Sequence, residues 1–535
     1  MIPSPVGPNG DISPQINTSA LNRIDHVNRL NNNPFLSVER TQAQPSVQVP
    51  RLPGSSGLTN MVNTCYMNSA IQVLAHAYPF TNYLLSNKPT IIVTLKKNAG
   101  KIFKDSFHYK QNSISTVIPP ELKQKILDPA YDYRTLTPEE EVLVLNGTMT
   151  FQLLKLLEVI WSRNCVAKPT SFKKIFSEVR NKFFKGHDQH DAEEAYSCIL
   201  QQVQEELAEE KRIKFKTTRE SVAAFINYNN EQTKKMNNEK DPIKKQRLYD
   251  EYLQKKKEMP NESLSLEAYR EMQTYYGKSY SPIVEIYTGF LHSTTMCPDP
   301  MCGFASNKFE AFQHLSLPIP SERNQPSERN QPWHLPGSSP LSTTNLGPTR
   351  GLTDLGLRMR YGSHMYYPNR LVTPTPPITL EECFEEFFKT EILDDQNLWV
   401  CDGCKQKVKG AKCLKIWTVP QILAIQLKRF DMYRGLKNSR LVTFPLVELD
   451  IGKYLSPAQY DSQKCYQYVL QSVINHEGSL AYGHYYSYCK DEDTNQWSRY
   501  DDASVSENID PTKIISESAY LLVYMHKDMI VQKNT

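Results

Sequence analysis

The spacing of apolar residues changes along the chain from a helical period to a strand period. Residues 57–210 carry apolar positions three and four apart, which is typical of helices packed on one face. The segment "DQHDAEEAYSCILQQVQEEL" (188–207) is the clearest case, with one stripe made of Ala192, Ala195, Tyr196, Ile199, Leu200, Val203 and Leu207. Residues 415–528 instead contain β-branched and aromatic runs broken by turn residues, as in "IWTVPQILAIQLKRF". Helices first and strands later, with few alternations, predict an α+β fold.

Three stretches interrupt these patterns. Residues 1–52 are rich in Pro, Asn, Ser and Gln and predict a disordered tail. Residues 208–280 are dense in both charge signs and predict inserted helices, whose charges we interpret as solvated faces rather than a binding surface. Residues 321–377 contain the tandem repeat "SERNQPSERNQP" and predict a disordered insertion, because two short copies cannot build a solenoid.

Composition narrows the class of protein. The 535 residues include 62 basic and 58 acidic side chains, a net charge of +4, which argues against a dedicated nucleic-acid binder. An 18-residue apolar run and a secretory signal are both lacking from the sequence, so we expect no membrane partner. Eleven cysteines without export indicate reduced thiols, and hence a protein of the cytoplasm or nucleus.

Cys65 in "GLTNMVNTCYMNSAIQVLAHAY" (57–78) is the first candidate for chemistry. Asn63 or Thr64 can cap a helix there, which places Cys65 in the first turn. The positive end of the helix dipole is expected to lower the pKa of the thiol. Backbone N–H groups and the Asn60 amide could then hold an oxyanion. The stretch alone leaves open a packed core cysteine or a metal ligand.

A histidine partner for this thiol occurs in "HEGSLAYGHYYSYCKDEDTNQWSRYDDASV" (476–505). The pattern predicts a hairpin with strands near 484–490 and 496–502 around the turn "DEDTN". A simple register then sets His484 opposite Asp502, within one or two positions, so Asp501 and Asp502 both remain candidates. A carboxylate on one ring nitrogen leaves the other to take a thiol proton. The alternative is an exposed strand histidine without a chemical role.

Two cysteine pairs have metal-ligand spacing. Cys297 and Cys302 lie in "CPDPMC", and Cys401 and Cys404 lie in "CDGC". Together they predict one structural, all-thiolate zinc site that joins two hairpins and keeps no open position for catalysis. The alternative is four reduced thiols in a site that has lost its metal.

Four separated segments together resemble the ubiquitin-specific protease family of deubiquitinating cysteine proteases. They are "GLTNMVNTCYMNSAIQVL", "QHDAEEAYSCIL", "LWVCDGCKQKVKGAKCLKIWTVPQILAIQLKRF", and "HEGSLAYGHYYSYC" with "WSRYDDASV", and they come in family order. The resemblance implies Cys65 as nucleophile, His484 as general base and Asp501 as the third residue of the triad. It also implies supporting roles for Asn60 and Asp502, and it assigns substrate binding to Asp191 and Tyr485. For Asp191 a helix cap is the structural alternative, and both roles are compatible.

The implied fold is a papain-like right hand, in a catalytic domain over 53–528 with a short tail at 529–535. The thumb would span 57–207, the zinc-tipped fingers 283–320 and 378–414, and the palm 415–528. The implied activity is hydrolysis of the bond after the C-terminal glycine of ubiquitin on ubiquitinated proteins.

Departures from the family pattern are Met61, Val62 in place of a glycine, Ala195 in place of an aromatic, and an elongated first knuckle. The β-branched Val62 is expected to resist a positive φ and so to reshape the oxyanion loop. A ubiquitin-binding scaffold with weak or no activity, or a protease for another ubiquitin-like modifier, are the alternatives.

Overall fold

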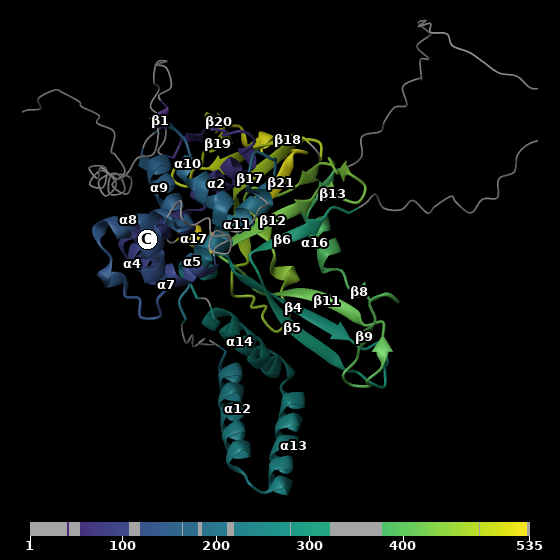
Figure 1. Cartoon of the computed structure of the whole chain (residues 1–535). Helices are drawn as coiled ribbons and strands as arrows, with labels where there is room; N and C mark the ends of the chain where they lie inside the picture. The colour runs from purple at the N-terminus through teal and green to yellow at the C-terminus, as the bar shows by residue number, and fades with distance from the viewer. Residues whose placement is uncertain are drawn as a thin grey trace, which may run out of the picture.

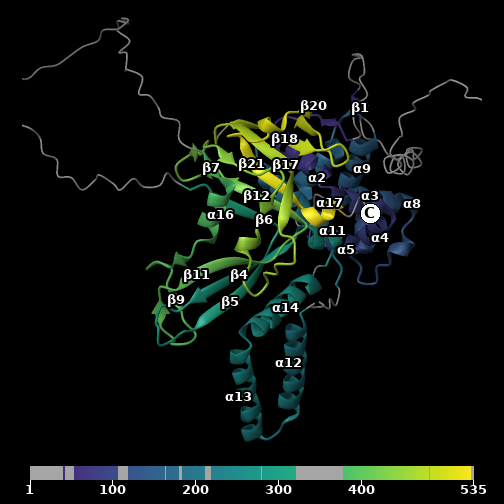
Figure 2. The same ribbon diagram turned by 180° about the vertical axis from the view of Figure 1, so that it is seen from behind.

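The computed structural model describes residues 40–41, 54–105, 118–162, 164–179, 184–210, 219–278, 280–320, 377–480 and 482–531. Figures 1 and 2 show them from opposite sides, with a helical lobe, a central sheet, a long sheet reaching away from it and a projecting helical pair. The predicted α+β class is confirmed, since the helical lobe comes first and most of the central sheet comes last. The predicted tail 1–52 and insertion 321–377 lie outside the described residues, apart from 40–41 and 377.

The helical lobe is built around one buried helix, α2 (Cys65–Ala75). The other helices are α3 (Tyr78–Ser86), α4 (Lys88–Lys97), α5 (Ala99–Asp105), α7 (Pro120–Leu127), η2 (Tyr133–Thr135), α8 (Pro138–Asn146), α9 (Met149–Ser162), α10 (Thr170–Val179) and α11 (Ala192–Glu206). All eleven residues of α2 are buried, so it has no solvent face, unlike the one-sided stripe its sequence suggests. The reason is its position, because α11 and α3 cover one side and the central sheet covers the other.

The central sheet has the strand order β20-β19-β18-β17-β21-β12-β6, with β16 paired to β17. Its strands are β6 (His314–Pro318), β12 (Ile422–Lys428), β16 (Leu449–Asp450), β17 (Gln467–Gly478), β18 (Gly483–Lys490), β19 (Trp497–Asp501), β20 (Ser504–Ile509) and β21 (Ala519–His526). Both faces are covered, which explains the continuous apolar runs: in β21, Leu521 and Val523 pack on the helical lobe, whereas Leu522 and Tyr524 pack on the opposite side. One face of the central sheet therefore packs against α2.

A second, four-stranded sheet extends away from the central one in the order β5-β4-β11-β8. Its strands are β4 (Gly289–Met296), β5 (Ala305–Phe312), β8 (Glu391–Ile392) and β11 (Ala411–Thr418), and the pair β9 (Trp399–Val400) and β10 (Lys407–Val408) lies at its far end. The helices α12 (Glu220–Asn238), α13 (Pro242–Glu258), α14 (Pro260–Lys278) and α15 (Pro282–Tyr287) precede it. Met272 and Tyr276 of α14 pack on Phe290 and Trp417 of the sheet, whereas α13 has no buried residue and projects with α12.

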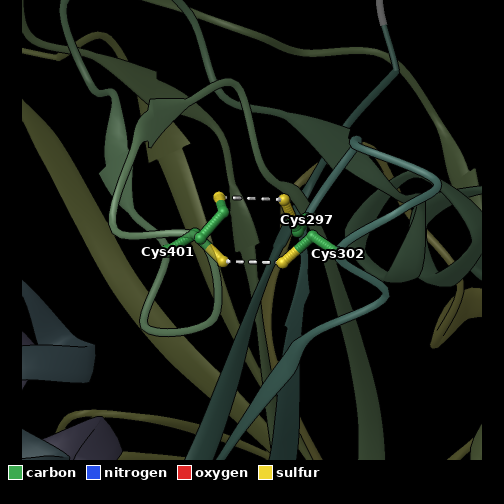
Figure 3. A group of neighbouring side chains, drawn as sticks. Cys297, Cys302 and Cys401 are labelled. Atoms are coloured by element: carbon green, nitrogen blue, oxygen red, sulfur yellow. Dashed lines mark hydrogen bonds between the residues drawn. The ribbon is translucent and has the colours of Figure 1, made fainter.

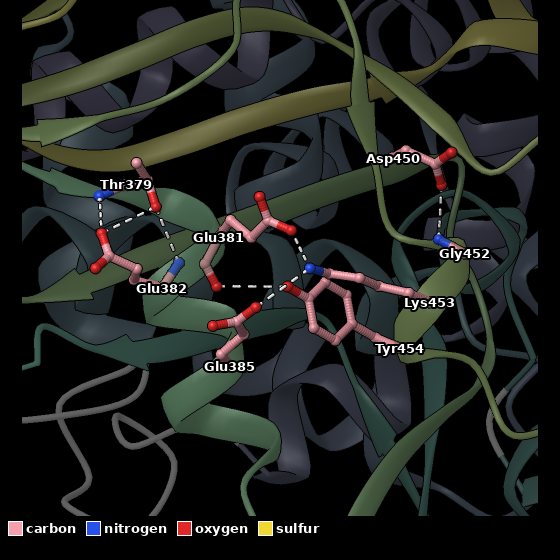
Figure 4. A network of polar contacts seen from close by, with 8 residues as sticks. All are labelled: Thr379, Glu381, Glu382, Glu385, Asp450, Gly452, Lys453 and Tyr454. Atoms are coloured by element: carbon pink, nitrogen blue, oxygen red, sulfur yellow. Dashed lines mark hydrogen bonds and ion pairs between the residues drawn. The ribbon is translucent and has the colours of Figure 1, made fainter.

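The face of the central sheet opposite the helical lobe carries α16 (Leu380–Phe388). A capping box between Thr379 and Glu382 starts this helix. Lys453 of η5 (Gly452–Tyr454) pairs with Glu381 and Glu385 of α16, as Figure 4 shows, and Tyr454 donates to the Glu381 carbonyl at 3.4 Å. A cavity of about 1170 Å³ lies between α16 and the segment 443–467. These contacts tie α16 to the sheet, far along the chain from Cys65.

Short elements complete the described chain. They are β1 (Arg40–Thr41), β2 (Gly57–Leu58), β3 (Val166–Ala167), β7 (Ile378–Thr379), β13 (Phe430–Asp431), β14 (Leu436–Lys437), β15 (Val442–Thr443), η6 (Pro511–Lys513) and α17 (Lys527–Val531). Two of these elements lie within segments that the sequence predicts to be tails. β1 lies within 1–52 and is ordered by pairing with β3. α17 extends into 529–535, where Met529 and Ile530 pack on the core. Among the described residues no single helix is long and apolar enough to cross a membrane; α8 and α9 pass that test only together, across an 87° bend.

Candidate active site

The candidate nucleophile Cys65 is the first residue of α2 and is 3% exposed. Thr64 occupies the N-cap position, but its side chain does not cap the helix. Instead its Oγ1 accepts the Met61 N–H at 2.9 Å, and its own N–H donates to Asn60 Oδ1 at 3.0 Å. The polar groups before Cys65 therefore fold the 60–64 loop onto itself rather than extend the helix.

Val62 and Asn63 in this loop both have left-handed backbone angles, with φ of +62° and +54°. The expectation that a β-branched residue would avoid positive φ here is wrong. The Val62 side chain points to solvent, at 59% exposure, and the loop hydrogen bonds around Thr64 close the turn regardless of the residue at 62. The loop keeps a shape that suits glycine, and valine bears the conformational cost.

Burial raises the pKa of the Cys65 thiol above its ordinary value of 9.0, so the expectation of a lowered pKa is also wrong. Hydrogen bonds from the backbone of Tyr485, Tyr66 and Cys65 itself favour the thiolate, whereas the charge of Asp502 opposes it. The helix N-terminus does act as expected, but desolvation of the sulfur is the larger effect. In the free protein the thiol therefore keeps its proton until a base removes it.

His484 lies at the start of β18, the strand that packs against α2 and its first residue, Cys65. The next residue, Tyr485, gives a backbone hydrogen bond to the sulfur, which fixes the strand against the first turn of α2. The predicted hairpin is present, and Ser487 pairs with Tyr500 in its β18–β19 register. The ladder stops there, so the next acid is free to turn toward the imidazole: His484 Nε2 lies 2.6 Å from Asp501 Oδ1. That bond leaves Nδ1 of the ring for the proton of a thiol.

Asp501 and Asp502, which the register argument could not separate, have different partners. Asp501 also pairs with the Arg499 guanidinium at 2.8 Å, which holds its carboxylate in place. Asp502 instead accepts from Asn60 Nδ2 at 2.8 Å and from Asn68 Nδ2 at 2.7 Å. Asp501 therefore bonds to His484, whereas Asp502 fixes the side-chain amide of Asn60, the predicted oxyanion donor.

Arg499 and Asn68 were missed by sequence reasoning. Asn68 could have been found, because it is a polar residue within a buried helix and lies three positions after Cys65. Arg499 carries no comparable signal, since an arginine two residues before an acid is common in an exposed strand.

The two candidate substrate-binding residues both lie in this region. Asp191 caps α11 through the Glu193 N–H at 2.7 Å and accepts from Tyr520 at 2.5 Å, and burial raises its pKa. The helix-cap alternative is thus realised, and both carboxylate oxygens already have partners inside the protein. Tyr485 is 7% exposed, and its backbone N–H favours the thiolate of Cys65.

The four candidate metal ligands come together at the far end of the second sheet. Their sulfur atoms all lie within 4.8 Å of one another, with Cys297 to Cys404 at 3.9 Å and Cys302 to Cys401 at 3.6 Å. Figure 3 labels three of them and shows the two pairs facing each other. Tetrahedral zinc with Zn–S bonds of about 2.3 Å spaces its sulfurs by about 3.8 Å, so the cluster fits the ion. Gly403 is required by this packing, since a Cβ there would lie 2.7 Å from Cys302 Sγ.

The chain matches the family model described as ubiquitin carboxyl-terminal hydrolase over residues 56–524. A probable ubiquitin carboxyl-terminal hydrolase of Acanthamoeba polyphaga mimivirus is 41% identical over 476 residues, 89% of this chain and 91% of that protein. The Drosophila melanogaster hydrolase Usp2 is 24% identical over 88% of this chain but only 35% of its own length. A probable hydrolase of Schizosaccharomyces pombe is 41% identical over 28% of this chain and 19% of its own length.

Among solved structures, a chain of the SAGA Ubp8/Sgf11/Sus1/Sgf73 DUB module bound to ubiquitin aldehyde is similar. It has a TM-score of 0.47 and 19% identity, over 91% of this chain and 72% of that one. The family match alone spans the loop before Cys65, α11, the cysteine cluster and the His484 hairpin. The chain therefore belongs to the ubiquitin carboxyl-terminal hydrolase family and is a deubiquitinase of the cysteine-protease type.

Proposed function

We propose that Cys65 attacks the carbonyl carbon of the last glycine of ubiquitin and that His484 carries the proton. The observation that supports this most is the arrangement around β18: Asp501 holds Nε2 of His484, while the backbone of the adjacent Tyr485 holds the Cys65 sulfur. Because burial raises the pKa of the thiol, His484 acts as a general base during attack rather than as the partner of a pre-formed thiolate.

The reaction proceeds in two halves. In the first, the thiol proton passes to His484, the S–C bond forms, and the tetrahedral intermediate collapses with cleavage of the C–N bond. The leaving lysine amine takes the proton from His484. In the second half, His484 removes a proton from water, the hydroxide attacks the thioester, and the departing sulfur receives that proton. Ubiquitin leaves with a free C-terminal carboxylate.

Asn60 is our candidate donor to the oxyanion. Its Oδ1 accepts from Thr64, which fixes which end of the amide is the nitrogen, and one Nδ2 hydrogen points to Asp502. The second hydrogen of Nδ2 remains for the substrate oxygen. Asp502 then acts on the reaction by orienting Asn60, and not by proton transfer.

Asp191 and Tyr485 are our candidates for the channel that receives the C-terminal tail of ubiquitin. Tyr485 belongs to β18, and its hydroxyl lies near Asp191, the backbone of Ala192 and Cys65. Two glycines in that tail suit a channel between buried side chains. Since Tyr520 and the Glu193 N–H already bind Asp191, its role would be to fix the start of α11 as a wall of this channel.

A single structural zinc ion is the cofactor we propose for the cluster Cys297, Cys302, Cys401 and Cys404. Four thiolates would complete its coordination, so it would join two chain segments that lie about a hundred residues apart and supply no catalysis. We further propose action in the cytoplasm or nucleus, because none of the eleven cysteines forms a disulfide and reduced cysteines are typical of those compartments.

Hydrolysis of a ubiquitin C-terminal fluorophore amide tests this function. The wild-type protein should release the fluorophore, and Cys65→Ala should abolish release while still binding ubiquitin. Replacement of Cys413, a half-buried cysteine outside both sites, by Ser is the matched control and should leave turnover intact. Turnover by Cys65→Ala would refute the assigned nucleophile, and a wild-type protein that binds ubiquitin without turnover would favour the scaffold alternative.

A further inference from the structure

We infer that Gln189 is a positioning residue, which holds the strand that carries His484 in its working place beside Cys65. The inference rests on the proposed roles of those two residues. It starts from a pair of hydrogen bonds between one side-chain amide and one backbone residue: Gly483 N–H donates to Gln189 Oε1 at 3.2 Å, and Gln189 Nε2 donates to the Gly483 carbonyl at 3.1 Å.

Among the described residues, the first part of β18 has no neighbouring strand on one side. β18 pairs with β17 from Gly483 to Cys489, but with β19 only from Ser487 to Lys490. On the open side, outward-pointing backbone groups recur every second residue. The N–H and the carbonyl of Gly483 on this side both bond to Gln189. The backbone of Tyr485, two residues on, bonds to the Cys65 sulfur. The amide of Gln189 and the thiol of Cys65 thus occupy successive positions along the edge that flanks His484.

Gln189 belongs to a short segment that is fixed at three alternate residues. The His187 carbonyl accepts from Asn63 Nδ2 at 2.8 Å, in the loop before the nucleophile. Gln189 binds Gly483, and Asp191 binds Tyr520 of β21 at 2.5 Å while it caps α11. This segment, residues 187–191, therefore connects the Cys65 loop, the His484 strand and the central sheet. Through Gln189 this segment is hydrogen-bonded to the His484 strand.

Only an amide side chain of this length supplies what Gly483 requires. A backbone residue presents one donor and one acceptor side by side, and a primary amide is the complementary side-chain group. Asparagine is one methylene shorter and would not reach without movement of the chain. Methionine has a similar length and offers neither a strong donor nor a strong acceptor, so it separates the polar contacts from simple packing.

The inference is tested by steady-state kinetics of the full chain with the ubiquitin fluorophore amide. Gln189→Met and Gln189→Ala should each lower kcat by about tenfold, since two hydrogen bonds that place the base are lost. KM should stay within about twofold, because the contacts are to the protein and not to ubiquitin. Gln201→Met is the matched control: Gln201 is an exposed glutamine of α11 whose side chain bonds to Glu205 of the same helix, and its replacement should change neither constant.

Two further readouts separate positioning from a merely structural role. Ubiquitin binding, measured with Gln189→Met placed in the Cys65→Ala background, should equal that of Cys65→Ala alone, and the melting temperature should match the Gln201→Met control. An unchanged kcat in both Gln189 variants, a loss in Gln189→Ala but not in Gln189→Met, or a rise in KM without a fall in kcat would each overturn the inference. Turnover by Cys65→Ala itself would instead refute the proposed function, so the two failures are distinguishable.

Discussion

Val62 places a β-branched residue in a left-handed conformation two positions after the candidate oxyanion donor Asn60. Its φ is +62°, and Asn63 follows at +54°. Asparagine tolerates this region, whereas valine does so only at a cost. The side chain is 59% exposed and gains little burial in return. The left-handed backbone at Val62 is therefore expected to lower the free energy of unfolding of the protein.

Val62→Gly should therefore stabilise the protein by about 0.5–1 kcal/mol, which is the left-handed cost of valine less the extra freedom of glycine in the unfolded chain. Val447→Gly is the matched control, because Val447 is 58% exposed and does not have a positive φ; that change should destabilise the protein. Denaturant titration of the three proteins measures both effects. Equal destabilisation by the two changes would show that Val62 bears no strain.

The Cys65 thiol makes a second prediction at this scale. Since burial raises its pKa above 9.0, the thiolate is the minor form near neutral pH and its fraction grows as the pH rises. The rate at which iodoacetamide alkylates Cys65 in the free protein should climb with pH to beyond pH 9. Mass spectrometry of the Cys65 peptide gives this rate separately from those of the other thiols. A plateau that begins below pH 7 would instead indicate a pre-formed thiolate and imidazolium pair.

At the scale of elements, the hairpin β18–β19 and the helix α2 differ in how much of their arrangement is local. The hairpin register follows from the turn and the alternating pattern, so an acid opposite His484 could be predicted from a short stretch of sequence. The choice of Asp501 over Asp502 could not, since it depends on the ladder stopping at Ser487 and on partners from α2 and its loop. Likewise, the apolar stripe of α2 is visible in the sequence, but its burial on all sides is set by α11 and the sheet.

At the scale of elements, the cysteine cluster predicts that the protein binds zinc. Purified protein should contain about one zinc ion per chain, and Cys401→Ser should lower both the zinc content and the melting temperature, because the proposed ion would join two chain segments at the far end of the second sheet. Cys413→Ser is the control within the same sheet: Cys413 lies on β11 outside the cluster, and its replacement should leave the zinc content unchanged. Full zinc content in Cys401→Ser, or none in the wild-type protein, would contradict a four-thiolate site.

At the scale of the whole molecule, the candidate active site joins chain segments that no local pattern connects. The Cys65 helix packs against the His484 strand across more than four hundred residues. The residue types suggested that the two residues are partners, and the resemblance assigned their roles. The sequence wrongly predicts a lowered pKa for the thiol. Burial of the sulfur, which raises the pKa, depends on the assembled core and cannot be predicted from the first turn of a helix. Gln189 was missed for a related reason, since its partner is a backbone residue on a strand from the far end of the chain.

The central claim is that these distant segments make Cys65 the nucleophile toward ubiquitin, and a covalent probe tests it most directly. The protein should be incubated with ubiquitin that carries a C-terminal vinyl sulfone, then digested and mapped by mass spectrometry over all eleven cysteines. We predict a single adduct at Cys65, absent in Cys65→Ala and strongly slowed in His484→Ala. An adduct at another cysteine, or hydrolysis of the ubiquitin amide without any adduct at Cys65, would contradict the account.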